Sequence, residues 1–278
     1  HKSYIMRKYK ITVLTDLERD AGATLKSAIG LAKIIDGEIE VFSVKKASEI
    51  VHSENQLSAM RSINSGHNSF RKKMKKFIAP ISEQYDIRID SSFSIGNIKG
   101  EIGQYIDTKK PDIIVLGKRR EKVLKIVGDS IIPFVLNKFK GVILIANNNS
   151  VIEPNKEIVL GMFNNLGADF NLDFAEDLIE NSHQPLISFK IAQNSDVSEG
   201  SNKPSNRKTI EYVFEQGDGA IRGISTYLVK NKIDVLYVDR FKRRNGKKIN
   251  TLKSDINKII DKLNVTLLLT GEERYNLK

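Results

Sequence analysis

The chain contains no cysteine among its 278 residues. This absence excludes disulfide bonds, catalysis by a thiolate, and zinc or iron–sulfur sites built on cysteine. Histidine is scarce too, and the four residues are His1, His52, His67 and His183. No two of them lie four residues apart, the spacing that places two imidazoles on one face of a helix. A histidine-based metal site therefore has little support.

Long apolar runs are also missing. No apolar segment approaches the roughly 18 residues that a membrane-spanning helix requires. The basic residues 1–10 are not followed by the apolar stretch of a secretory signal. Together with the lack of cysteine, which suits a reducing compartment, these features predict a cytoplasmic protein that does not enter a membrane.

Three motifs of common enzyme classes are absent from the sequence. It has no Gly-x-x-x-x-Gly-Lys-[Ser/Thr] P-loop, no Gly-x-Ser-x-Gly nucleophile elbow, and no Ser-Gly-Gly-x-Asp-Ser signature of ATP pyrophosphatases. A lone carboxylate, Asp16, follows the first expected strand. We interpret it as structural or ligand-orienting rather than catalytic, and we favour a role without enzymatic activity while a slow ATPase stays an open alternative.

Positive charge is concentrated in the first half of the chain. Residues 1–150 carry 26 Lys and Arg against 16 Asp and Glu, whereas residues 151–278 carry 19 against 18. Such an excess can indicate an anionic partner. However, the run Arg71–Lys76 supplies five of these charges on an amphipathic stretch, and such runs are usually solvated helix faces. We therefore favour the solvated face.

The stretch Pro111–Arg120 is the most informative part of the sequence. Apolar residues run unbroken from Ile113 to Leu116, as in a strand buried on both faces. Gly117 ends this run, a basic loop follows, and Ser130 stands at the N-cap position of an expected helix. A strand, a glycine-containing loop and a helix N-terminus form the arrangement with which parallel α/β sheets hold phosphate.

Strand and helix patterns alternate through the first half of the chain. The expected strands are Lys10–Thr15, Ile39–Val44, Ile87–Ile95, Ile113–Leu116 and Gly141–Ala146, and the expected helices are Asp20–Ile35, residues 50–85, Ile98–Thr108 and Ile131–Lys140.

After an Asn-rich linker the same plan begins again, and Asp234–Arg240 repeats Asp112–Lys118 at an offset of 122 residues. The offset is too long for a solenoid repeat and indicates two sequential domains. We expect a first domain at 6–147, a linker at 148–156 and a second domain at 157–272. Its expected strands are Glu157–Phe163, Leu186–Ile191, Thr209–Phe214, Asp234–Arg240 and Val265–Leu269, with helices at Gly167–Glu180, Gly219–Lys230 and Leu252–Leu263, and loops at Gln193–Lys208 and Arg240–Lys248.

These features resemble the universal stress protein family in its tandem two-domain form. The resemblance is carried by Val13–Asp16, Phe42–Val44, Pro111–Gly117, Asp129–Ser130 and the closing strand Gly141–Ile145. It implies an α/β fold with two tandem flavodoxin-like domains, each a doubly wound, five-stranded parallel sheet. It also implies that the two domains pair with each other through their fifth strands. A homodimer is a further option, and the protein partner is unknown.

The resemblance also implies a nucleotide site in the first domain. ATP-binding members carry Gly-x-x-Gly, nine residues, then Gly-Ser or Gly-Thr after the fourth strand. Here Arg120 replaces the second glycine, the spacer is one residue short, and Asp129 precedes the serine. The positions that correspond to the family's site, or that lie in its basic loop, are Thr15, Asp16, Val44, Gly117, Arg119, Arg120, Gly128 and Ser130.

Physical arguments about this loop point in two directions. Arg120 adds a side chain where the backbone should approach phosphate, and the Asp129 carboxylate competes for the helix N-terminal N–H groups. Against this, the loop has five basic side chains and only one acidic one, Glu121, so it could attract an anion through side-chain contacts. The basic residues are Lys118, Arg119, Arg120, Lys122 and Lys125. In the second domain, Asp239 takes the place of Gly117 and would repel phosphate. ATP or another adenine nucleotide is therefore a candidate cofactor in the first domain alone.

Three functional hypotheses remain open. The first, which we favour, is a stress-response regulatory protein that acts by interaction, with nucleotide binding weak or lost. The second is an ATP-binding switch or slow ATPase that uses the first domain. The third is a nucleic-acid-binding protein, ranked last because Tyr and Phe are not interleaved with the basic run Arg71–Lys76.

Overall fold

The computed structural model describes residues 9–18, 20–49, 56–118, 131–163, 172–192, 208–217, 219–240, 242–244, 247–249 and 259–270. The first half contains β1 (Tyr9–Leu14), α1 (Ala21–Ile35), β2 (Gly37–Lys45), the 3-10 turn η1 (Ala47–Glu49), α2 (Gln56–Tyr85), β3 (Ile89–Ile95), α3 (Ile98–Lys109), β4 (Ile113–Gly117), α4 (Ile131–Lys138) and β5 (Val142–Ala146). The second contains β6 (Leu160–Phe163), α5 (Ala175–Glu180), β7 (Leu186–Ala192), β8 (Thr209–Glu215), α6 (Ala220–Lys230), β9 (Val235–Val238), β10 (Lys242–Arg244), β11 (Lys247–Ile249) and β12 (Thr266–Leu269).

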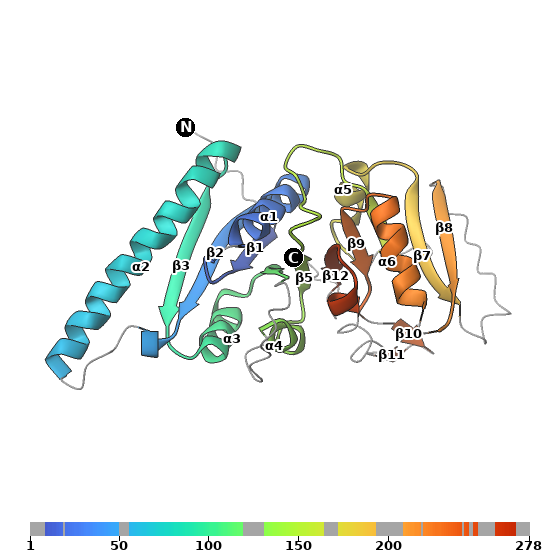
Figure 1. Cartoon of the computed structure of the whole chain (residues 1–278). Helices are drawn as coiled ribbons and strands as arrows, with labels where there is room; N and C mark the ends of the chain where they lie inside the picture. Colours follow the sequence, from blue (N-terminus) through green and yellow to red (C-terminus); the bar gives the residue numbers. More distant parts are fainter. Residues whose placement is uncertain are drawn as a thin grey trace.

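Ten strands form one continuous sheet in the order β3-β2-β1-β4-β5-β12-β9-β6-β7-β8 (Figure 1). All neighbours within a half are parallel, whereas β5 and β12 pair antiparallel, with Leu144 opposite Leu268. Each half therefore has the strand order 3-2-1-4-5, and the predicted pair of tandem, doubly wound α/β halves is confirmed. In this order the chain reverses direction across the sheet between strands one and four, whereas flavodoxin itself has the order 2-1-3-4-5.

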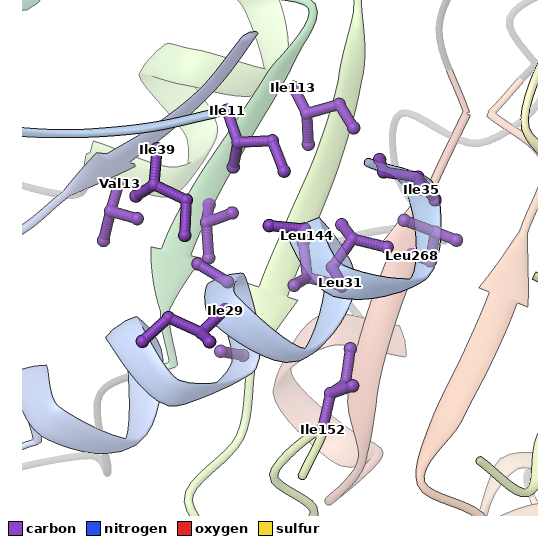
Figure 2. Close-up of a cluster of buried hydrophobic side chains, with 14 of the residues drawn as sticks. Ile11, Val13, Ile29, Leu31, Ile35, Ile39, Ile113, Leu144, Ile152 and Leu268 are labelled. Atoms are coloured by element: carbon purple, nitrogen blue, oxygen red, sulfur yellow. The ribbon is translucent and has the colours of Figure 1, made fainter. Parts of the chain in front are cut away.

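Two buried apolar clusters lie on the two faces of this sheet, and both contain side chains from both halves. Figure 2 shows part of the first, where α1 packs on the strands and Leu268 of β12 joins from the second half. The rings of Tyr9 and Phe174 meet edge to face across the halves, with centroids 5.3 Å apart. Both apolar clusters therefore extend across the two halves.

Helix α1 forms where the sequence predicts it, because Leu25, Ala28 and Ile29 recur at helical spacing and are fully buried. It ends at Asp36, whose φ of 53° lies in the left-handed region. The linker crosses α1 closely at Gly30, where a Cβ would meet the carbonyl oxygen of Ile152 at 2.3 Å. Glycine is thus required at this crossing, which packs the linker against the first half.

The paired aspartates Asp112 and Asp234 tie the fourth strand of each half to the first. The Asp112 carboxylate accepts a hydrogen bond from the Lys10 N–H at 2.7 Å, and the Asp234 carboxylate accepts one from the Val159 N–H at 2.8 Å. Backbone bonds run the other way, from each aspartate N–H to the carbonyl of the same partner. In each half, this exchange of hydrogen bonds fixes the register of the first strand against the fourth. It explains why an aspartate stands before the fourth strand in both halves.

The structure differs from the sequence predictions in the segment after β9. We expected a loop at Arg240–Lys248, whereas β10 and β11 form an antiparallel hairpin in which Arg243 is opposite Lys248. The Asn245-Gly246 dipeptide between them is a strong sequence signal for a tight hairpin turn, and it was overlooked. Parts of the expected helices Gly167–Glu180 and Leu252–Leu263, and most of the expected loop Gln193–Lys208, lie outside the described residues.

None of the helices that the structure describes combines the length and the apolar content needed to cross a membrane.

Asp234 makes a testable contribution to the pH dependence of stability. Burial raises its pKa, because it disfavours the charged carboxylate, and this outweighs the opposing effect of the Val159 hydrogen bond. A raised native pKa means that the folded state holds the proton more tightly, so stability falls as pH rises through that pKa. Compared with Asp234→Asn, the wild-type protein should therefore gain unfolding free energy as pH is lowered from neutral towards about 4. Urea titrations of both proteins across this range measure the difference, and a constant difference would contradict the prediction.

Candidate functional site

The candidate site lies at the carboxyl ends of β1, β2 and β4, where the strand order reverses. Leu14 of β1 is opposite Phe42 of β2 and Leu116 of β4. Because these strands are parallel, the residues that follow them meet at one edge of the sheet. Doubly wound sheets bind ligands at such a reversal point. The structure thus brings four of the predicted site residues to one edge, namely Thr15, Asp16, Val44 and Gly117.

The turn between β1 and α1 is held by its own side chains. The Thr15 hydroxyl accepts a hydrogen bond from the Leu17 N–H at 3.0 Å, and the Asp16 carboxylate accepts one from the Glu18 N–H at 3.1 Å. Leu17 is buried and has a φ of 62°. Asp16 is exposed, and its carboxylate supports this turn.

Gly117 is explained by the packing of α1 against the end of β4. A Cβ at this position would lie 2.5 Å from the Thr24 hydroxyl oxygen. This hydroxyl donates a hydrogen bond to the Asp20 carbonyl at 3.2 Å, so it lies in the first turn of α1. A side chain at 117 would therefore require the Thr24 hydroxyl to move, at the expense of its hydrogen bond to Asp20. Packing against α1 therefore favours glycine at 117 whether or not a ligand is bound.

Lys118, the first basic residue after β4, is directed at the other half of the chain. Its ammonium donates hydrogen bonds to the carbonyl oxygens of Leu263 at 2.8 Å and Asp261 at 3.3 Å. These carbonyls lie at the end of the helical residues 259–262, where the helix dipole favours a cation. Lys118 therefore has a structural role in place of the anion contact considered from the sequence.

Arg240 makes the reciprocal contacts from the second half. It is 4% exposed, and its guanidinium donates to the carbonyl oxygens of Phe139, Gly141, Leu136 and Thr270. Leu136 and Phe139 lie at the C-terminal end of α4. The offset of 122 residues relates Lys118 to Arg240, and it relates Asp261 and Leu263 to Phe139 and Gly141. The two contacts thus follow an approximate two-fold symmetry around the pairing of β5 with β12.

The corresponding edge of the second half is also committed to structure. Asp239, in the place of Gly117, accepts a hydrogen bond from the Thr270 hydroxyl at 2.8 Å. The same hydroxyl accepts one from the Arg240 N–H at 3.1 Å. This network ties the end of β9 to the residue that follows β12.

Four of the predicted site residues, Arg119, Arg120, Gly128 and Ser130, lie outside the described residues. Their assignment to a nucleotide site stays a prediction. In the part of the chain that the structure describes, no three His, Asp or Glu side chains are grouped so that they could hold a metal ion. The contacts that Lys118 and Arg240 each make with carbonyl oxygens of the opposite half were not predicted from the sequence. The recurrence of a basic residue directly after the fourth strand of each half was the available signal.

No protein-family model matches the sequence, and no curated protein matches it. Solved structures do. A universal stress protein from Archaeoglobus fulgidus DSM 4304 has 15% identity and a TM-score of 0.65, and the match covers 95% of this chain and 98% of that one. A functionally unknown protein from Pseudomonas aeruginosa PAO1 has 12% identity and a TM-score of 0.55, over 94% and 92% of the two chains. The chain therefore has the tandem fold of a universal stress protein along almost its whole length.

Removal of the Arg240 or the Lys118 side chain tests how much each residue contributes to the stability of the protein. Arg240→Ala leaves several buried carbonyl oxygens without donors and should lower the unfolding free energy by about 3 kcal/mol. Lys118→Ala, at a half-buried position, should cost about 1 kcal/mol. Guanidinium denaturation measures both values. Equal, negligible losses would show that these contacts do not stabilise the join between the halves.

The close packing at Gly117 predicts a specific coupling with Thr24. Gly117→Ala should destabilise the protein by about 2 kcal/mol, because the new Cβ overlaps the Thr24 hydroxyl. Combining it with Thr24→Ala removes the overlapping oxygen, so the double variant should lose less than the two single losses added together. Thermal unfolding of the four proteins in this cycle measures the coupling. Strict additivity would contradict the packing explanation for the glycine.

Proposed function

We propose that this protein is a tandem member of the universal stress protein family that acts in the cytoplasm as a stress-response regulatory protein, through interaction with other macromolecules. In this proposal nucleotide binding is weak or lost. The likeness to the archaeal universal stress protein supports the family assignment at the level of the fold. The contact of Lys118 with Asp261 and Leu263 is the observation that carries the loss of nucleotide binding.

The argument from Lys118 is one of competing contacts. An ammonium that donates to two carbonyls of the opposite half must break both bonds before it can turn towards a phosphate. Each such bond to a charged donor contributes about 1.5–3 kcal/mol, which a nucleotide would have to supply. In the second half, Asp239 and Arg240 are engaged with Thr270, and a carboxylate stands where a phosphate would approach. Both halves thus use these positions to hold the chain together.

The alternative function is an ATP-binding switch or slow ATPase that uses the first half. It is favoured by the edge at which Thr15, Asp16, Val44 and Gly117 follow β1, β2 and β4. The phosphate contacts would then come from the basic residues 119–125 rather than from Lys118. This alternative requires an adenine ring to rest against Val44, which is half-buried beside the apolar cluster on one face of the sheet.

Titration calorimetry of the full chain with magnesium ATP distinguishes the two functions. We expect a dissociation constant above about 100 µM, because the Lys118 contacts oppose phosphate binding. Mass spectrometry of the protein purified without added ligand should show no bound nucleotide. Tighter binding, or nucleotide retained at near-equal amounts, would overturn the proposal.

If nucleotide does bind, a matched pair of variants identifies the half responsible. Val44 and Ile191 occupy equivalent positions, because each lies two residues after the residue that pairs with the end of its first strand, Phe42 or Phe189. Under the alternative, Val44→Glu should abolish ATP binding while Ile191→Glu leaves it unchanged. Equal effects would exclude a site confined to the first half.

A further inference from the structure

A groove runs between α2 and β3 at the outer end of the sheet. Its volume is about 620 Å³. Figure 1 shows α2 passing alongside β3, which is the terminal strand of the sheet order. The groove is lined by a stripe of α2 and by the outer side of β3, and the residues that matter most are His67, Arg71, Met74, Lys75, Ser91 and Phe93.

One wall of the groove is β3, whose outer edge pairs with no described strand. The Gly96 N–H donates to the Lys45 carbonyl of β2 at 3.0 Å. Because alternate residues of a strand direct their backbone groups to the same side, those of Ile89, Ser91 and Phe93 point away from β2. No described strand pairs with this side of β3. Such an edge is able to accept a further strand.

The helical wall of the groove is positively charged. Arg71 and Lys75 are exposed and lie one turn apart on α2, and within the described part of the chain neither forms an ion pair. Their neighbour Lys73, in contrast, is paired with Glu18 at 3.1 Å. Met74 is buried between them and gives this wall an apolar base. The groove therefore combines two available cations, an apolar base and an open strand edge.

We infer that this groove binds an extended acidic peptide segment of a partner protein, which adds to β3 as an eleventh strand of the sheet. The inference rests on the interaction role proposed above. Two residues four apart on a helix are separated by about 6 Å along its axis. Alternate residues of a strand are about 6.6 Å apart. Acidic side chains at positions i and i+2 of the peptide thus match the spacing of Arg71 and Lys75.

Charge and ring contacts disfavour two other occupants. A second copy of this chain would bring its own basic helix against Arg71 and Lys75, which is a repulsive arrangement. Single-stranded nucleic acid would need an open aromatic face on which to stack a base. The Phe93 ring already contacts the rings of His67, at 4.4 Å between centroids, and Phe70, at 5.0 Å. An acidic peptide needs no such face, because its main chain binds the strand edge.

Fluorescence anisotropy with a labelled probe peptide tests the inference. The probe is a short peptide in which glutamate and valine alternate, and its control has the same composition with the glutamates in one block. We expect the alternating probe to bind the full-length protein roughly tenfold more tightly than the block probe, because its carboxylates alone match the cation spacing. Equal binding of the two peptides would overturn the inference.

Two matched pairs of variants separate the groove from general charge attraction. Arg71→Glu with Lys75→Glu should weaken probe binding roughly tenfold or more, whereas Lys72→Glu with Lys76→Glu, the same charge change on exposed positions outside the groove lining, should change it little. Ser91→Pro removes an N–H that points away from β2, so the pairing of β2 with β3 should persist. Because the added peptide loses this hydrogen bond, probe binding should weaken roughly tenfold. Ser91→Ala keeps this N–H and should bind normally. Circular dichroism checks that each variant is folded.

Each outcome has a defined meaning. If the two charge-reversed doubles weaken binding equally, or if Ser91→Pro binds as well as Ser91→Ala, the groove is not the site and the inference is wrong. Tighter binding of a labelled single-stranded oligonucleotide than of the probe, unchanged by Ser91→Pro, would also overturn the inference. If the probe peptide does not bind in the groove and ATP does not bind either, the inference is wrong but the proposed function stands. Probe binding together with tight ATP binding would retain the groove and overturn the proposed function.

Discussion

The antiparallel pairing of β5 with β12 is the interaction on which the rest of the structure depends. It joins two five-stranded sheets into one, and it brings apolar side chains of both halves into each of the two buried clusters. Lys118 and Arg240 reinforce the same join, each donating to carbonyls in the opposite half. A cation that reaches main-chain carbonyls across this pairing stabilises the join without requiring an acidic partner there.

This constraint reaches the candidate site, because the residue after the fourth strand serves both regions. In the ATP-binding proteins that the sequence resembles, the nucleotide loop begins at that position. Here its side chain closes the contact between the halves in both copies, and Gly117 just before it is explained by the Thr24 hydroxyl. The edge formed by β1, β2 and β4 retains the geometry of a ligand site while its nearest charged groups are used for structure. The α2–β3 groove, in contrast, lies at the outer end of the sheet, and Arg71 and Lys75 in its wall form no ion pair within the described residues.

Much of the fold could be predicted from the sequence, because local patterns specify it. Unbroken apolar runs such as Ile113–Leu116 predict central strands, and helical spacing in Asp20–Ile35 predicts α1 almost to the residue. The β10–β11 hairpin was missed because its strands are short and strongly charged, although Asn245-Gly246 marks a turn. For the candidate site, the sequence placed four residues that the structure describes, and their binding of a nucleotide stays a prediction. Thr15, Asp16, Val44 and Gly117 do meet at one edge, since parallel strands align their carboxyl ends.

The sequence by itself determined the alternation of strands and helices, the duplication of the plan and the excess of positive charge in the first half. These properties depend on neighbouring residues or on composition. The tertiary structure alone decided which groups the basic side chains contact. Lys118 and Arg240 look like members of basic loops, and their role depends on carbonyls more than 90 residues away in the chain. Likewise, Arg71 and Lys75 became the wall of a groove only because folding places α2 beside the unpaired edge of β3.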